Sequence, residues 1–80
     1  MIWRYLTTAS GRATLDVLRG RTLVERVRGV AQTGRNSIAW GARRGGHAAA
    51  PARYGMRLTI TTPDGQLEIA HGAVRVRAAR

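Results

Sequence analysis

Residues 22–33, with the sequence TLVERVRGVAQT, decide between two folds for this 80-residue chain. Thr22 and Glu25 have the spacing of a capping box, in which each side chain accepts a hydrogen bond from the backbone amide of the other residue. Apolar residues then recur at the spacing of one helix face, at Leu23, Val24, Val27, Val30 and Ala31. We therefore predict one helix over residues 23–33, although Gly29 inside it would lower helix stability.

Two short runs that are compatible with β-strands precede this segment. Residues 2–8 and 13–18 are separated by Ala9-Ser10-Gly11-Arg12, where Ser and Gly favour a turn, so we predict an N-terminal hairpin. Another strand is predicted at residues 37–43, because Ile38, Trp40 and Ala42 occupy alternate positions.

The C-terminal 25 residues carry the clearest strand pattern. Met56, Leu58 and Ile60 alternate with polar residues, and Thr62-Pro63-Asp64-Gly65 has the composition of a tight turn. We expect Leu67 and Ile69 to return on the same apolar face, with His71-Gly72 as a second turn. Val74 and Val76 would then complete a three-strand meander. Its opposite face would present Arg57, Arg75 and Arg77.

These elements predict a small, single α+β domain over residues 1–80. A hairpin and the helix at 23–33 would pack with an antiparallel sheet that ends in the meander. Residues 44–55, rich in Gly and Ala and containing Pro51, are predicted to be a mobile loop. The alternative is an all-β small barrel, which would apply if residues 21–31 are extended.

The charge of the chain is strongly unbalanced. It has 14 basic residues, all of them Arg, against four carboxylates, which gives a net charge of +10. Such an excess repels itself in the folded state and is typical of proteins that bind an anionic partner. A GC-rich genome would explain the use of Arg in place of Lys, but it would not explain the small number of acids.

Several functional classes are excluded or disfavoured by composition. The chain has no Cys, which excludes disulfides, Cys-ligated zinc, iron–sulfur clusters and a catalytic thiol. The longest uncharged stretch is residues 45–52, far shorter than the roughly 20 residues of a transmembrane helix. His47 and His71 lack metal-ligand spacing, and the sequence contains no phosphate-binding glycine motif. We expect no enzyme activity, metal or cofactor.

The arginines predict where an anionic partner would bind. Guanidinium groups suit phosphate oxygens, and three groups of arginines are the candidates for nucleic-acid binding. They are Arg19, Arg21, Arg26 and Arg28 near the predicted helix; Arg43 and Arg44, with Arg53, near the loop; and Arg57, Arg75 and Arg77 on the sheet. Trp40, or Trp3 with Tyr5, could stack on bases, although Trp40 is more simply explained as a core residue.

Together these features favour a non-enzymatic module that binds the phosphate backbone of DNA or RNA. The alternative is a structural subunit of a virion or other large assembly, which would bind an acidic protein surface by charge and strand pairing. A third interpretation, that residues 1–11 form an organelle targeting segment, is weakened by their lack of a helical apolar stripe. The small core is compatible with a homo-oligomer. The expected location is cytoplasmic, with the nucleoid or a virion.

Overall fold

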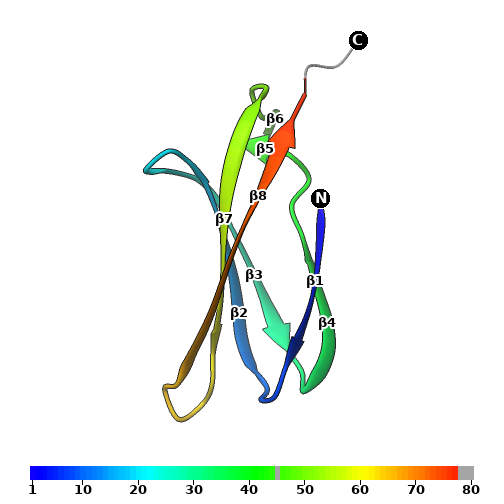
Figure 1. Cartoon of the computed structure of the whole chain (residues 1–80), viewed down its shortest axis with the longest axis vertical. Coiled ribbons are helices and arrows are strands. Elements are labelled where there is room, and N and C mark those ends of the chain that lie inside the picture. Colours follow the sequence, from blue (N-terminus) through cyan, green and yellow to red (C-terminus); the bar gives the residue numbers. More distant parts are fainter. Residues whose placement is uncertain (45, 78–80) are drawn as a thin grey trace.

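The computed structural model describes residues 1–44 and 46–77 and contains only β-strands as regular elements. Figure 1 shows them along the long axis of the molecule. The strands are β1 (Ile2–Thr7), β2 (Gly11–Arg19), β3 (Thr22–Ala31), β4 (Gly34–Ala39), β5 (Arg43–Arg44), β6 (His47–Ala48), β7 (Ala52–Thr61) and β8 (Leu67–Val76). They form a four-stranded antiparallel sheet in the order β3-β2-β7-β8 and two antiparallel pairs, β1-β4 and β5-β6.

The predicted helix at residues 23–33 is wrong, because this segment forms strand β3 and pairs with β2 along its length. The helix would have buried Leu23 and Val30 on one face, yet these side chains are 44% and 79% exposed. β-branched residues are frequent in the segment and favour an extended backbone. A bulge beside Leu23 shifts the register and disrupts the alternation that would have indicated a strand. The α+β fold class is therefore wrong, and the all-β alternative has the correct class.

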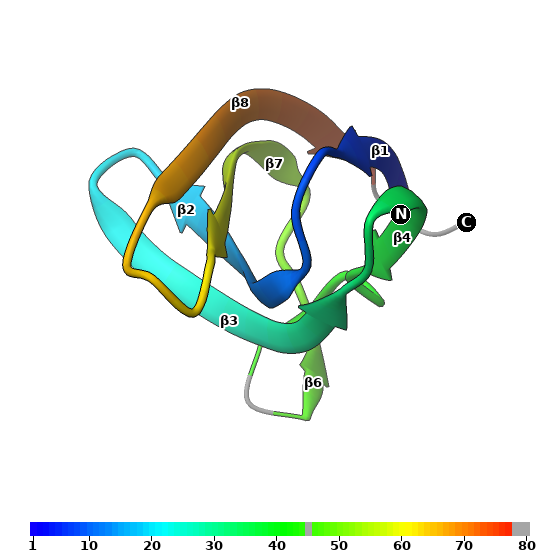
Figure 2. The same cartoon turned by 90° about the horizontal axis from the view of Figure 1, so that it is seen from below.

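The N-terminal hairpin is also wrong, although both of its strands exist. Strand β1 pairs with β4, more than 25 residues away in the sequence, with Ile2 opposite Ala39 and Thr7 opposite Gly34. Strand β2 lies instead between β3 and β7. Seen along its long axis, the molecule has the four-stranded sheet curving around one side, with β1 and β4 across from it (Figure 2).

The C-terminal region forms one long hairpin in place of the predicted meander. The Thr62–Gln66 turn is confirmed, because the Gly65 amide donates to the Thr62 carbonyl at 3.0 Å and Gly65 has a φ of 87°. The turn at His71-Gly72 is wrong, since β8 runs continuously through both residues. Its Val74 faces the core side, opposite Tyr54.

The absence of the second turn reverses the expected orientation of two apolar residues. Because β8 is uninterrupted, its side chains keep one alternation, and the inward position of Val74 requires Leu67 and Ile69 to face outward. They are 60% and 54% exposed, whereas they were predicted to lie on the apolar face.

The core lies between the concave side of the four-stranded sheet and the β1-β4 pair. Leu15 and Val17 of β2 are fully buried, and alternate residues of β7 from Tyr54 to Ile60 pack beside them. Trp40 follows β4 and meets Tyr54 edge to face, with ring centroids 5.1 Å apart. This contact joins the β1-β4 pair to the main sheet.

Strands β1 and β8 approach closely at Gly72. A Cβ atom placed on Gly72 would lie 3.3 Å from Cη2 of Trp3, so the absence of a side chain there makes room for the indole ring. Near the other end of this seam, the Thr7 hydroxyl donates to the Glu68 carboxylate at 3.0 Å.

The segment predicted as a loop at residues 44–55 contains more regular structure than expected. Strand β6 and the first residues of β7 lie within it, and the side chains of Ala49 and Tyr54 are buried. The Tyr54 hydroxyl donates to the Ala50 carbonyl at 2.5 Å, which fixes the approach to β7. Gly45 lies outside the described residues, and the mobility of the segment stays a prediction.

Candidate nucleic-acid interface

The outer side of the four-stranded sheet carries a concentration of arginines. The register places side chains of all four strands on this convex side, opposite the core residues. The arginines on it are Arg12, Arg26, Arg28, Arg53, Arg57 and Arg75, and we call this surface the arginine face. All six are exposed. Among the described residues, Asp16 is the only acid on this face.

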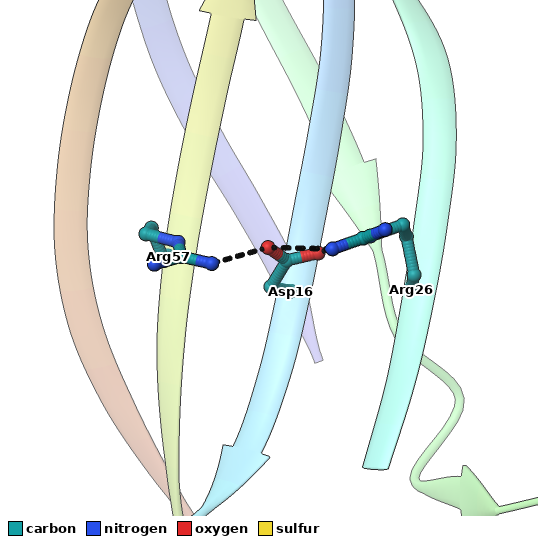
Figure 3. Close-up of polar contacts among 3 residues, drawn as sticks. All are labelled: Asp16, Arg26 and Arg57. Carbon is teal, nitrogen blue, oxygen red and sulfur yellow. Dashed lines mark hydrogen bonds and ion pairs between the residues drawn. The ribbon is translucent and has the colours of Figure 1, made fainter. Parts of the chain in front are cut away.

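Asp16 is held by two of these arginines across three adjacent strands (Figure 3). Its Oδ1 accepts a hydrogen bond from Nε of Arg26 on β3 at 2.7 Å, and its Oδ2 accepts one from Nη2 of Arg57 on β7 at 2.8 Å. The side chain of Asp16 is only 5% exposed, whereas those of Arg26 and Arg57 are 43% and 44% exposed. The cluster keeps a net charge of +1.

These hydrogen bonds determine the charge state and the geometry of the cluster. The bond from Arg26 lowers the pKa of Asp16 below its ordinary value of 3.8; Arg57 acts in the same direction, and burial opposes both. Asp16 is therefore ionised at neutral pH. It orients two guanidinium groups along the sheet while part of each stays in contact with solvent, and their remaining N–H groups are free to bind an anion.

A shallow hollow of about 310 Å³ adjoins the cluster. It is lined by Asp16, Arg26 and Arg28, together with the hydroxyl-bearing residues Thr14 and Thr59. Thr14 lies directly between Arg28 and Thr59 in the register of the sheet. Hydroxyl donors beside guanidinium groups are common partners of phosphate oxygens.

The ten arginines predicted from the sequence fall into two neighbouring regions. Five belong to the arginine face: Arg26, Arg28, Arg53, Arg57 and Arg75. The others are at the end of the molecule that holds the β2-β3 turn and the β5-β6 pair (Figure 1): Arg19, Arg21, Arg43, Arg44 and Arg77. There, Arg43 and Arg77 help to line a hollow of about 550 Å³. Arg43 also donates through Nη1 to the Gly46 carbonyl at 2.9 Å.

Sequence reasoning left Arg12 out of the candidate residues and grouped Arg53 with the loop, although the pattern that places both on strands was present. Arg12 precedes the alternating core positions Ala13 and Leu15, so period-two alternation places it on the outside of β2. Arg53 precedes buried Tyr54 in the same way on β7. Arg53 had been grouped with the loop because β7 was expected to begin later.

Trp40 does not form a stacking surface. It is 3% exposed, and its Nε1 donates to the Arg43 carbonyl at 3.0 Å, so it belongs to the core. Trp3 and Tyr5 are partly buried against that core and point away from the outer side of their strand. Among residues 1–44 and 46–77, the arginine face holds no Trp or Tyr; the imidazole of His71, opposite Arg57, is its one aromatic ring.

The acids are distributed differently from the arginines. Asp64 lies in the β7-β8 turn and Glu68 near the start of β8, at the opposite end of the molecule from the β2-β3 turn and the β5-β6 pair (Figure 1). The Thr62 hydroxyl donates to the carboxylate of Asp64 and lowers its pKa. Glu25 lies on β3 nearer the other end, where five arginines outnumber it, so the two ends of the described chain differ in charge.

Residues 1–44 and 46–77 contain no group of three His, Cys, Asp or Glu residues that could hold a metal ion. None of their secondary structure is a helix of the length and hydropathy needed to cross a membrane. Comparisons with protein-family models, curated proteins and solved structures found no match for the chain.

Proposed function

We propose that this protein is a non-enzymatic nucleic-acid-binding module whose arginine face contacts the phosphate backbone. The observation that carries the proposal is the placement of six arginines from four strands on one side of a sheet. The one carboxylate among them is already hydrogen-bonded to two of the arginines, which leaves a strongly positive surface. Bound phosphates would neutralise this surface and release counterions from the nucleic acid.

The spacing of the arginine face supports contact with several phosphates. Neighbouring strands lie about 4.8 Å apart, and alternate residues along a strand are separated by about 6.8 Å. Outward residues that pair across neighbouring strands form rows on the arginine face. Arg12 lies in one row, Arg28 in the next row, and the cluster of Arg26, Asp16 and Arg57 in the row after that. A face of this size could contact phosphates from more than one nucleotide, without reading base edges.

The salt dependence of binding tests this proposal. If the face neutralises about five phosphates of a duplex, a plot of log affinity against log salt concentration should have a slope of about −4.5. A labelled duplex titrated at several NaCl concentrations measures the slope, and duplexes of unrelated sequence should bind alike. No binding at low salt, or a flat slope, would overturn the proposal. Matching single-stranded DNA and duplex RNA would identify the preferred nucleic acid.

A specific observation supports a second candidate function, as a subunit of a virion or another assembly. Strand β8 is an edge of the four-stranded sheet, and its outward residues Leu67 and Ile69 are exposed. An edge strand presents backbone donors and acceptors that can pair with a strand of another protein. Pairing of this kind should persist at high salt, whereas phosphate binding should not. With either function we expect the protein in the cytoplasm, with nucleoid or virion material.

A further inference from the structure

Arg53 and Arg75 occupy directly opposite positions on β7 and β8. Directly opposite residues of an antiparallel pair have Cβ atoms about 5 Å apart and side chains on the same side of the sheet. Both arginines are exposed, and together with Ala73 and Val74 they line a hollow of about 210 Å³. The structure therefore places two guanidinium groups beside one small hollow at the edge of the arginine face.

This pair has no acid to balance it within residues 1–44 and 46–77. The ion pairs of the described residues join Asp16 to Arg26 and to Arg57, and neither involves Arg53 or Arg75. Asp16 itself lies two rows further along the sheet. Like charges directly opposite in a sheet destabilise it, so the fold holds this pair together against its own repulsion. An anion bound in the hollow would remove that repulsion.

We propose that Arg53 and Arg75 form a clamp for a dianionic phosphate group. A single guanidinium fork can satisfy both oxygens of a carboxylate, whereas a phosphate monoester presents three oxygens and a charge of about −1.5 to −2 at neutral pH. Two opposed forks match that charge and number of acceptors. The clamp deepens the proposed function, because it would hold a terminal phosphate at the edge of the nucleic-acid surface, but its test does not require nucleic-acid binding.

Thermal unfolding at low ionic strength tests the clamp with inorganic phosphate as the probe. We expect phosphate to raise the melting temperature by about 5 °C more than NaCl of equal ionic strength, since a ligand that binds the folded state stabilises it. Arg53→Gln and Arg75→Gln should each abolish this additional rise in melting temperature, which we call the phosphate increment. Without phosphate, each variant should melt about 1–5 °C above the unmodified protein, because the repulsion is relieved.

Arg4→Gln is the matched control. It removes one charge from an exposed position on β1, opposite Ser37 and away from the clamp, so the additional rise in melting temperature with phosphate should remain. Equal effects of phosphate and NaCl on the unmodified protein would overturn the clamp. An increment that survives in both Arg53→Gln and Arg75→Gln would also overturn it. Neither result would alter the salt slope on which the proposed function depends.

The source of the phosphate can be identified with one oligonucleotide, prepared with and without a 5′-phosphate. A preference of about tenfold for the phosphorylated form, lost in Arg53→Gln, would support the clamp and assign it to nucleic-acid ends. Equal binding of both forms, with the inorganic phosphate increment intact, would support a site for free phosphate. Equal binding together with the absence of that increment would overturn the proposal.

Discussion

The two larger sheets are built on different principles. Strands β2, β3, β7 and β8 are held by long backbone ladders, and their outer side carries six arginines together with exposed Val30, Leu67 and Ile69. The β1-β4 pair has a six-residue ladder, and its outer side combines Arg4 and Arg35 with exposed Ile2 and Leu6. Arginine alone therefore does not distinguish the candidate interface. What distinguishes it is that four strands bring arginines from distant parts of the chain onto one surface.

The two sheets also depend on each other in different ways. Side chains join the β1-β4 pair to the main sheet, through the Trp40–Tyr54 contact and the Trp3–Gly72 approach. The arginine face is organised within the main sheet, around Asp16. Variants in the first set should therefore change stability, and variants on the face should mainly change binding.

Removal of the Trp40 side chain should have the largest effect. Trp40→Ala would leave a cavity against Tyr54 and should lower the free energy of unfolding by about 3–5 kcal/mol. Leu6→Ala is the control within the same layer. Leu6 is 74% exposed, so its replacement should change stability by no more than about 0.5 kcal/mol. Urea unfolding followed by circular dichroism measures both, and similar losses would contradict the assigned core.

Asp16→Asn should have the next largest effect, because it removes charge-assisted hydrogen bonds from a buried site. We expect a loss of about 2 kcal/mol at pH 7. Glu68→Gln is the control, since Glu68 is exposed and its contacts with Thr7 and Thr8 should contribute less than about 0.5 kcal/mol. If Asp16→Asn costs no more than Glu68→Gln, the cluster does not organise the face.

The same variant gives a pH test. The pKa of Asp16 is lower in the folded protein than its ordinary value of 3.8. Its ionised form therefore adds stability above pH 3.8, and that contribution is lost as the pH falls through the folded pKa. As the pH is lowered below about 4, the urea concentration at the unfolding midpoint should decrease more for the unmodified protein than for Asp16→Asn. Parallel pH profiles for the two proteins would contradict the ion-pair geometry.

The arginine face and the outer side of the β1-β4 pair can be compared directly by removing the same charge from each. Arg12→Gln with Arg28→Gln should make the salt slope of duplex binding shallower by up to about two, because each phosphate contact contributes about one. Arg4→Gln with Arg35→Gln removes the same charge from the β1-β4 surface and should leave the slope almost unchanged. Equal reductions would show that net charge drives binding, without a defined face.

The smallest expected effect is a gain in stability at Gly29. This residue lies inside β3, and a Cβ atom placed on it would meet nothing within 4 Å. Gly29→Ala should raise stability by about 0.5 kcal/mol, because Gly loses more backbone entropy on folding. Chemical denaturation measures it. A loss of stability would indicate that the backbone at this edge of the main sheet needs glycine.

Local patterns predicted some of this structure and failed where pairing between distant segments decides it. The alternation of Met56, Leu58 and Ile60 and the turn ending at Gly65 were correct because they depend on neighbouring residues. The helix at 23–33 was wrong because a bulge beside Leu23 disguised a strand. The pairing of β1 with β4 has no local signal in the sequence, since it is selected by burial of the shared core.

The candidate site was also predicted only where local alternation decides it. Alternation along β7 and β8 correctly placed Arg57 and Arg75 on the outside of the sheet. The bond from Arg26 to Asp16 was missed because residues 23–33 were predicted as a helix, whereas they form the strand next to β2. The bond from Arg57 could not be predicted from local patterns, because it depends on the pairing of β2 with β7, which is distant in the sequence. The strand order also brings Arg12 and Arg53 onto the same surface.

The separation of charge along the molecule affects how it meets a partner. Near one end Asp64 and Glu68 balance Arg12 and Arg35, whereas toward the other end five arginines face only Glu25 among the described acids. The positive charge is therefore unevenly distributed along the long axis, which extends 43 Å. If the proposed partner is a polyanion, its field would turn the molecule before contact, with the turn between β7 and β8 directed away. Collisions would then begin in one orientation more often than chance allows. The association rate would fall with added salt along with the affinity.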